Sequence, residues 1–99
     1  MKLCMIGTGY VGLVSGTCFA DIGHTVHCVD NDTSKIDKLN SGQSPIYEPG
    51  LDELIKENCR SKRLFFTTNI SDALNKSDII FICVGTPNKK NSVSVDLSY

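Results

Sequence analysis

The chain has 99 residues, of which 40% are hydrophobic, and its formal net charge is −1 at pH 7. This length predicts a single modest domain, smaller than a complete two-domain enzyme. The charge gives no electrostatic reason to bind nucleic acid or an anionic membrane surface, and no apolar stretch is long enough to span a bilayer or to serve as a secretory signal. We therefore expect a cytoplasmic protein with neither kind of partner.

The first two predicted elements are a strand and a helix separated by glycines. Residues 2–6 are mostly apolar and predict a strand, and residues 10–21 predict a helix. In that helix Gly12, Gly16 and Ala20 recur at every fourth position. Such a stripe of small residues permits close approach of the helix to a sheet.

The segment Gly7-Thr8-Gly9-Tyr10-Val11-Gly12 joins this strand to this helix. Gly7 would allow the tight turn, Gly9 would let the main chain approach a pyrophosphate, and Gly12 would let the helix lie close on the strand. Free N–H groups at a helix start stabilise an anion without any basic side chain. The motif predicts dinucleotide binding; the alternative is that the glycines serve helix–strand packing alone.

A second predicted strand, residues 25–29, ends at Asp30, eighteen residues after Gly12. A carboxylate at this place accepts hydrogen bonds from both ribose hydroxyls of an adenosine, and it repels a 2′-phosphate. The pattern favours NAD over NADP. Lys35 either reaches the same ribose or is a solvated surface residue.

The remaining pattern alternates helices and strands. We expect a helix at residues 34–39 capped by Asp32 or Thr33, a helix from 51 to about 58, a strand at 64–67, a helix at 71–75 started by Ser71 and Asp72, and a strand at 79–84. The last strand is a continuous apolar run, typical of a strand covered on both faces.

This alternation predicts an α/β fold of the Rossmann type, a parallel sheet with helices on both faces and strand order 3-2-1-4. The sheet is incomplete, with four strands. Ligands bind beyond the carboxyl ends of its first and fourth strands. Residues 7–12 then form one wall of a crevice and residues 85–87 the other.

The five cysteines and two histidines predict no metal site. The cysteine count is odd, the sequence has no C-x-x-C pair, and Cys4, Cys28 and Cys83 fall in predicted strands, where thiols act as small hydrophobes. His27 and Cys28 are neighbours on a strand and point to opposite faces, while His24 lies in a turn.

Five segments together resemble the N-terminus of the UDP-glucose 6-dehydrogenases, within the UDP-glucose/GDP-mannose dehydrogenase family. The segments are residues 6–14, Val29-Asp30, residues 45–51, residues 81–87 and residues 96–99. The resemblance implies an enzyme that oxidises the C6 alcohol of UDP-glucose to a carboxylate with two NAD⁺ and a catalytic cysteine. It also implies cofactor contacts by Gly7, Gly9, Tyr10, Val11, Gly12, Asp30, Lys35 and Thr86.

By the same resemblance, the catalytic residues and the UDP-sugar site lie beyond residue 99, and Cys83 is not the nucleophile. We expect residues 1–99 to be a truncated N-terminal NAD-binding domain, inactive alone, and full-length relatives to be homodimers. The open fourth strand predicts a marginal, aggregation-prone domain. The alternatives are a non-catalytic nucleotide-binding module, an inactive remnant, or a substrate other than UDP-glucose, namely GDP-mannose or UDP-N-acetylmannosamine.

Tyr47 and Glu48 allow two interpretations. They either contact substrate or serve only as the entry to the helix that begins near Leu51, with Glu48 close to its positive end. We expect the structural role, because the loop leaves from the far side of the second strand.

Overall fold

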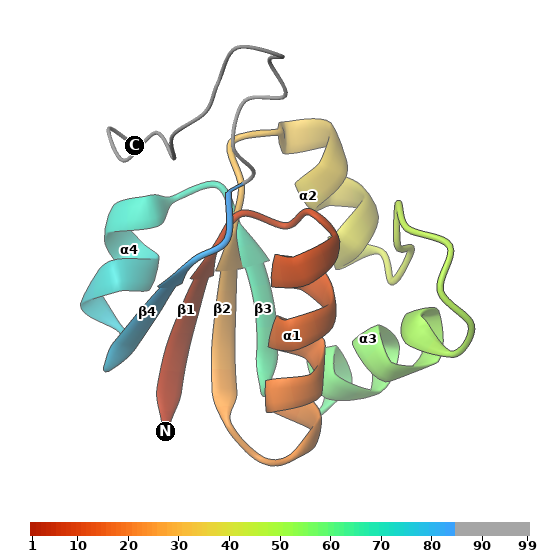
Figure 1. Cartoon of the computed structure of the whole chain (residues 1–99), viewed down its shortest axis with the longest axis horizontal. Coiled ribbons are helices and arrows are strands. Elements are labelled where there is room, and N and C mark those ends of the chain that lie inside the picture. Colours follow the sequence, from red (N-terminus) through yellow and green to blue (C-terminus); the bar gives the residue numbers. More distant parts are fainter. Residues whose placement is uncertain (85–99) are drawn as a thin grey trace, which may run out of the picture.

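A computed structural model describes residues 1–84 of the chain. The elements are β1 (Lys2–Ile6), α1 (Tyr10–Asp21), β2 (Thr25–Val29), α2 (Thr33–Asn40), α3 (Leu51–Arg60), β3 (Leu64–Thr67), α4 (Ile70–Asn75) and β4 (Ile79–Ile82). All strands are parallel, in the order β3-β2-β1-β4 (Figure 1). The predicted Rossmann-type fold and its strand order are confirmed.

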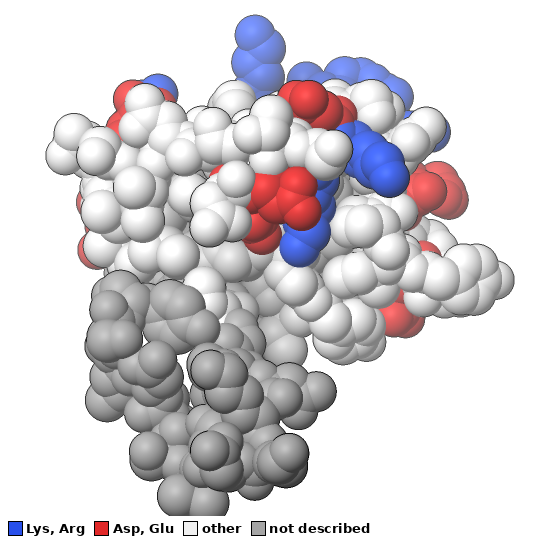
Figure 2. Space-filling model, turned by 90° about the horizontal axis from the view of Figure 1, so that it is seen from above, with Lys and Arg blue, Asp and Glu red and all other residues white. Residues whose placement is uncertain are grey.

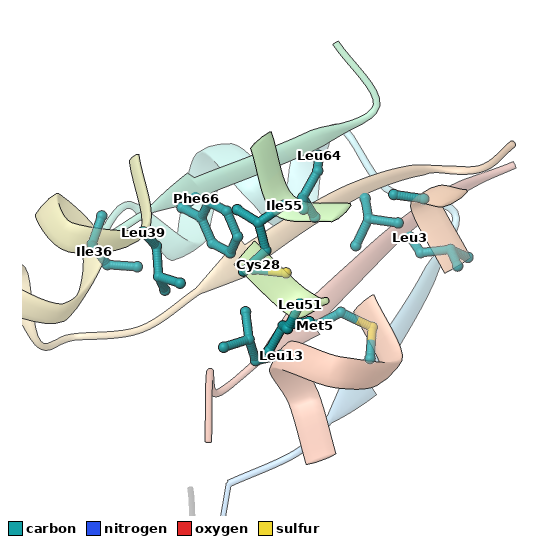
Figure 3. Packing of buried hydrophobic residues seen from close by; sticks show 12 residues of the cluster. Leu3, Met5, Leu13, Cys28, Ile36, Leu39, Leu51, Ile55, Leu64 and Phe66 are labelled. Carbon is teal, nitrogen blue, oxygen red and sulfur yellow. The ribbon is translucent and has the colours of Figure 1, made fainter. Parts of the chain in front are cut away.

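Helices cover both faces of the sheet. The larger core lies between the sheet and helices α1, α2 and α3, and it includes Leu3, Met5, Leu13, Cys28, Ile36, Leu39, Leu51, Ile55, Leu64 and Phe66 (Figure 3). Helix α4 packs on the other face through Ala73, against Cys4 and Val29. Within residues 1–84, no helix is both long and apolar enough to cross a membrane.

Several element boundaries differ from the predicted ones. Helix α4 begins at Ile70, because the Asn69 side chain accepts a hydrogen bond from the Asp72 N–H at 3.0 Å and caps the helix before Ser71. Strand β4 ends at Ile82, two residues early. Its partner β1 ends at Ile6, so the ladder closes with the pair Ile6 and Ile82.

Among the described residues strand β4 is open to solvent, as the expectation of an open fourth strand requires, and the expectation that both its faces are covered was wrong. Ile79, Ile80, Phe81 and Ile82 are all exposed, Ile82 by 69%. The strand lies at the edge of the four-stranded sheet, where α1 contributes a stack of Phe19 on Phe81 at 5.5 Å between ring centroids. An apolar edge strand of this kind is a template for self-association.

We predict that replacing Ile80 with Lys reduces self-association of the 99-residue chain, because a charged side chain disfavours edge-to-edge strand pairing. Sedimentation velocity at rising concentration measures this. Asn75→Lys is the matched control, since it adds the same charge on exposed α4. Equal effects of both variants, or a monomeric wild-type chain at millimolar concentration, would contradict the prediction.

The small-residue stripe of α1 lies directly against the sheet. A Cβ atom on Gly12 would collide with the carbonyl oxygen of Gly7, and one on Gly16 would meet the Cys28 Sγ atom at 3.0 Å. Neither backbone nor packed core yields readily to such contacts. These two glycines therefore set how closely α1 approaches β1 and β2.

Gly12→Ala should lower the free energy of unfolding by about 2–3 kcal/mol, because its methyl group displaces the Gly7 backbone rather than a flexible side chain. Gly9→Ala is the matched control: an added Cβ there meets no atom within 4 Å, and its φ of −71° suits alanine. Urea unfolding followed by circular dichroism compares the two. A Gly12→Ala variant as stable as Gly9→Ala would refute the close approach.

Candidate functional site

The turn between β1 and α1 has the geometry that its glycines predict. Gly7 has a φ of +105°, which side-chain-bearing residues rarely adopt, and its N–H donates to the Val29 carbonyl oxygen at 2.7 Å. A Cβ on Gly7 would meet the Cys83 carbonyl oxygen at 3.0 Å. The turn is thereby held between the ends of β2 and β4, at the carboxyl edge of the sheet.

The N-terminus of α1 is open toward this edge. Gly9 occupies the N-cap position, and no side chain of the described residues caps the helix there. Its first turn carries no acidic residue, and Tyr10 and Val11 are 57% and 62% exposed. Unpaired amides with partial positive charge and no competing carboxylate suit a phosphate group.

Asp30 lies beside this turn with its carboxylate held by three donors of the chain. The Thr8 N–H and Oγ1 donate to Oδ2 at 3.0 and 2.7 Å, and the Asp32 N–H donates to Oδ1 at 3.0 Å. Lys35 Nζ lies 3.5 Å from Oδ2. The structure therefore brings the predicted residues Asp30 and Lys35 together next to the glycine turn.

These contacts govern the charge of Asp30. Partial burial opposes ionisation, but hydrogen bonds from Thr8 and from the Asp32 N–H, with the positive charge of Lys35, outweigh it and lower the pKa of Asp30 below its ordinary value of 3.8. The carboxylate is therefore an anionic acceptor at neutral pH. A ribose diol suits it, and a phosphate does not.

A cavity of about 360 Å³ adjoins the turn. It is lined by Gly7, Asp30 and two further polar residues, Asn31 and Thr68, together with apolar side chains from the ends of the strands and the start of α4, namely Ile6, Val29, Ile70, Ile82 and Val84. Seen from this carboxyl edge, acidic and basic side chains are interspersed over the described part of the surface (Figure 2). A mostly apolar recess beside one carboxylate and one helix N-terminus fits a nucleoside with its phosphates.

The loop before α3 places Glu48 nearer to the site than we expected. Its carbonyl oxygen accepts from the Leu51 N–H at 3.0 Å, as the helix-entry role requires. Its carboxylate, however, accepts a hydrogen bond from the Tyr10 hydroxyl at 3.2 Å, which raises the pKa of Tyr10. The loop therefore reaches the start of α1, and it is not remote from the site.

Three further predictions concern Thr86, the orientation of His27 and Cys28, and metal binding. Thr86 and the wall at residues 85–87 lie outside the described residues. His27 stacks on Phe65 at 4.9 Å between ring centroids, while Cys28 belongs to the core under α1, so the two point to opposite faces as expected. Among the described residues, no group of three or more His, Cys, Asp and Glu residues is placed to hold a metal ion.

Sequence reasoning missed two contributors to the site. No role is predicted for Thr8 from the sequence, although its backbone and side chain both bind Asp30. The link from Tyr10 to Glu48 spans 38 positions, which no local pattern reveals. A hydroxyl residue between the first two glycines was the available signal for Thr8.

The parallel sheet, the glycine turn at its carboxyl edge and the acidic residue after β2 define a dinucleotide-binding domain of the Rossmann class. The chain belongs to the UDP-glucose/GDP-mannose dehydrogenase family: the family model for its NAD binding domain matches residues 1–99. NAD is thus the cofactor of this domain. The open approach at Gly9 and the anionic Asp30 fit its pyrophosphate and its adenosine ribose.

Individual relatives agree with this assignment. The chain is 57% identical over 99 residues to the UDP-glucose 6-dehydrogenase of Rhizobium meliloti and 56% identical over 98 residues to UDP-glucose 6-dehydrogenase TuaD of Bacillus subtilis. These matches cover 100% and 99% of this chain but 23% and 21% of those proteins.

A solved structure of this family also has a similar fold. The crystal structure of a ternary complex of GDP-mannose dehydrogenase from Pseudomonas aeruginosa has a TM-score of 0.90 and 46% identity, covering 98% of this chain and 22% of that one. The chain therefore spans between a fifth and a quarter of the length of these relatives.

We predict that Asp30→Asn lowers the free energy of unfolding at pH 7 by about 1 kcal/mol, because charge-assisted hydrogen bonds are lost. Since the folded-state pKa of Asp30 is depressed, this stabilisation is present above pH 3.8 and is lost as the pH falls through the lower folded value. Urea titrations at several pH values measure it. Asp37→Asn, at an exposed position of α2, controls for charge; a pH-independent difference would contradict the assignment.

Proposed function

We propose that residues 1–99 form the N-terminal NAD-binding domain of a UDP-glucose 6-dehydrogenase that acts in the cytoplasm. The observation that carries the proposal is the placement of the Asp30 carboxylate, ionised and held by Thr8, beside the open N-terminus of α1. A diphosphate at the helix start and a ribose diol at Asp30 are the two fixed points of a bound dinucleotide. The five unpaired cysteines are consistent with a reducing compartment.

The proposed contacts divide the cofactor among named residues. The backbone of residues 7–12 would take the pyrophosphate, and Val11 would lie against the cofactor. Asp30 and Lys35 would hold the adenosine ribose. The Lys35 Nζ atom lies 3.5 Å from the Asp30 Oδ2 atom. Thr86 would line the nicotinamide side.

NAD⁺ supplies a hydride acceptor when bound, and this chain contributes binding and orientation only. None of its residues is proposed as catalytic: the catalytic cysteine and the nucleotide-sugar site belong to the longer protein, which we propose acts as a homodimer. The thiol of Cys83 is a poor nucleophile, because burial raises its pKa. This supports placing the reactive cysteine elsewhere.

Glucose is the proposed sugar because the two relatives described above, at 57% and 56% identity, carry the name UDP-glucose 6-dehydrogenase, while the GDP-mannose dehydrogenase structure has 46% identity. GDP-mannose and UDP-N-acetylmannosamine are the alternative substrates. A non-catalytic module that binds a nucleotide is the alternative function, since all the proposed cofactor contacts come from residues of this chain.

Isothermal titration of the 99-residue chain should show NAD⁺ binding and weaker binding of NADP⁺, whose 2′-phosphate meets the Asp30 carboxylate. Asp30→Ala should weaken NAD⁺ binding about tenfold, because it removes a hydrogen bond to a charged group, whose net free energy corresponds to about that change in affinity. Gly9→Ala should weaken it as well, because the added Cβ stands where the pyrophosphate approaches.

Asp37→Ala is the matched control for the loss of an acidic side chain and should bind NAD⁺ as the wild type does. Equal affinity for NAD⁺ and NADP⁺, or an Asp30→Ala variant with unchanged affinity, would overturn the proposed role of Asp30. Absence of NAD⁺ binding by a folded wild-type chain would overturn the proposal for this chain as a whole.

A further inference from the structure

Thr8 stands out among the residues that surround the proposed cofactor site. Its side chain is fully buried, at 0% exposure, although it lies in a turn at the sheet edge. The hydroxyl has one donor proton, and an ionised carboxylate can only accept, so Thr8 Oγ1 is the donor in its 2.7 Å contact with Asp30 Oδ2. The hydroxyl is therefore committed to Asp30.

The bonds to Asp30 fix the direction in which its carboxylate faces. Thr8 donates twice to Oδ2, and the Asp32 N–H donates once to Oδ1. A carboxylate has about four acceptor positions, two on each oxygen. Thr8 thus fills the positions on Oδ2, beside which Lys35 Nζ lies at 3.5 Å, and Oδ1 keeps one position for a further donor. The carboxylate can therefore accept a hydrogen bond from one of the two ribose hydroxyls, and not from both as the sequence predicts.

We infer that Thr8 is a positioning residue for nucleotide binding, whose hydroxyl holds the Asp30 carboxylate so that Oδ1 accepts a ribose hydroxyl. The inference rests on the proposed function, because it requires Asp30 to be the ribose acceptor. Thr8 is buried, so the nucleotide does not contact its surface, and its hydroxyl donates to Asp30. This hydroxyl orients the Asp30 carboxylate before the nucleotide binds. Binding then loses less side-chain conformational entropy, and the affinity is higher.

The test compares Thr8→Val with Thr8→Ser, because valine keeps the shape of threonine without the hydroxyl and serine keeps the hydroxyl. The probes are ADP and 2′,3′-dideoxy-ADP, which lacks the ribose diol, titrated into the 99-residue chain. We expect Thr8→Val to bind ADP about tenfold more weakly than the wild type does, while its affinity for the dideoxy nucleotide is unchanged. Thr8→Ser should retain the wild-type affinity for both.

A loss that is equal for the two nucleotides would assign Thr8 a general structural role and overturn the inference. So would a Thr8→Val variant that still prefers ADP as strongly as the wild type. Failure of the wild type to prefer ADP over the dideoxy nucleotide would instead overturn the proposed role of Asp30, and the inference with it. If circular dichroism shows that Thr8→Val does not fold, Thr8→Ala against Thr8→Ser provides the same comparison.

Discussion

The contact between the start of α1 and the end of β1 is the constraint on which the site depends. Gly12 has no room for a side chain against the Gly7 backbone, and Gly7 adopts a φ of +105° while its N–H binds the end of β2. Because helix and strand meet this closely, the amides of α1 open at the carboxyl edge of the sheet (Figure 1). Any widening would move those amides away from Asp30.

The site couples two kinds of electrostatics within a small volume. A helix N-terminus offers partial positive charge, and Asp30 offers a full negative charge that Thr8 and Lys35 keep ionised. Because Thr8 lies in the glycine turn and binds Asp30, the two charges cannot shift independently. This suits a ligand with phosphates at one end of a ribose and hydroxyls on its ring.

The sequence predicted much of the fold because its signals are local. The glycine motif and the apolar runs predicted the same first and last residues of β1, α1, β2 and β3 as the structure has. Prediction was poorer where competing local choices existed, as at Asn69, Ser71 and Asp72, which can all cap α4. It also failed for the Tyr10–Glu48 contact, because that contact joins residues 38 positions apart.

The strand order has a consequence for how the chain acquires its structure during synthesis. Strand β1 is made first, yet it lies between β2 and β4, and its Leu3 pairs with Ile79. Until the ribosome has released residue 82, one side of β1 has unpaired amides and carbonyls. Such long-range parallel pairing is slow, so the nascent chain passes through a half-built sheet that other unpaired strands can engage.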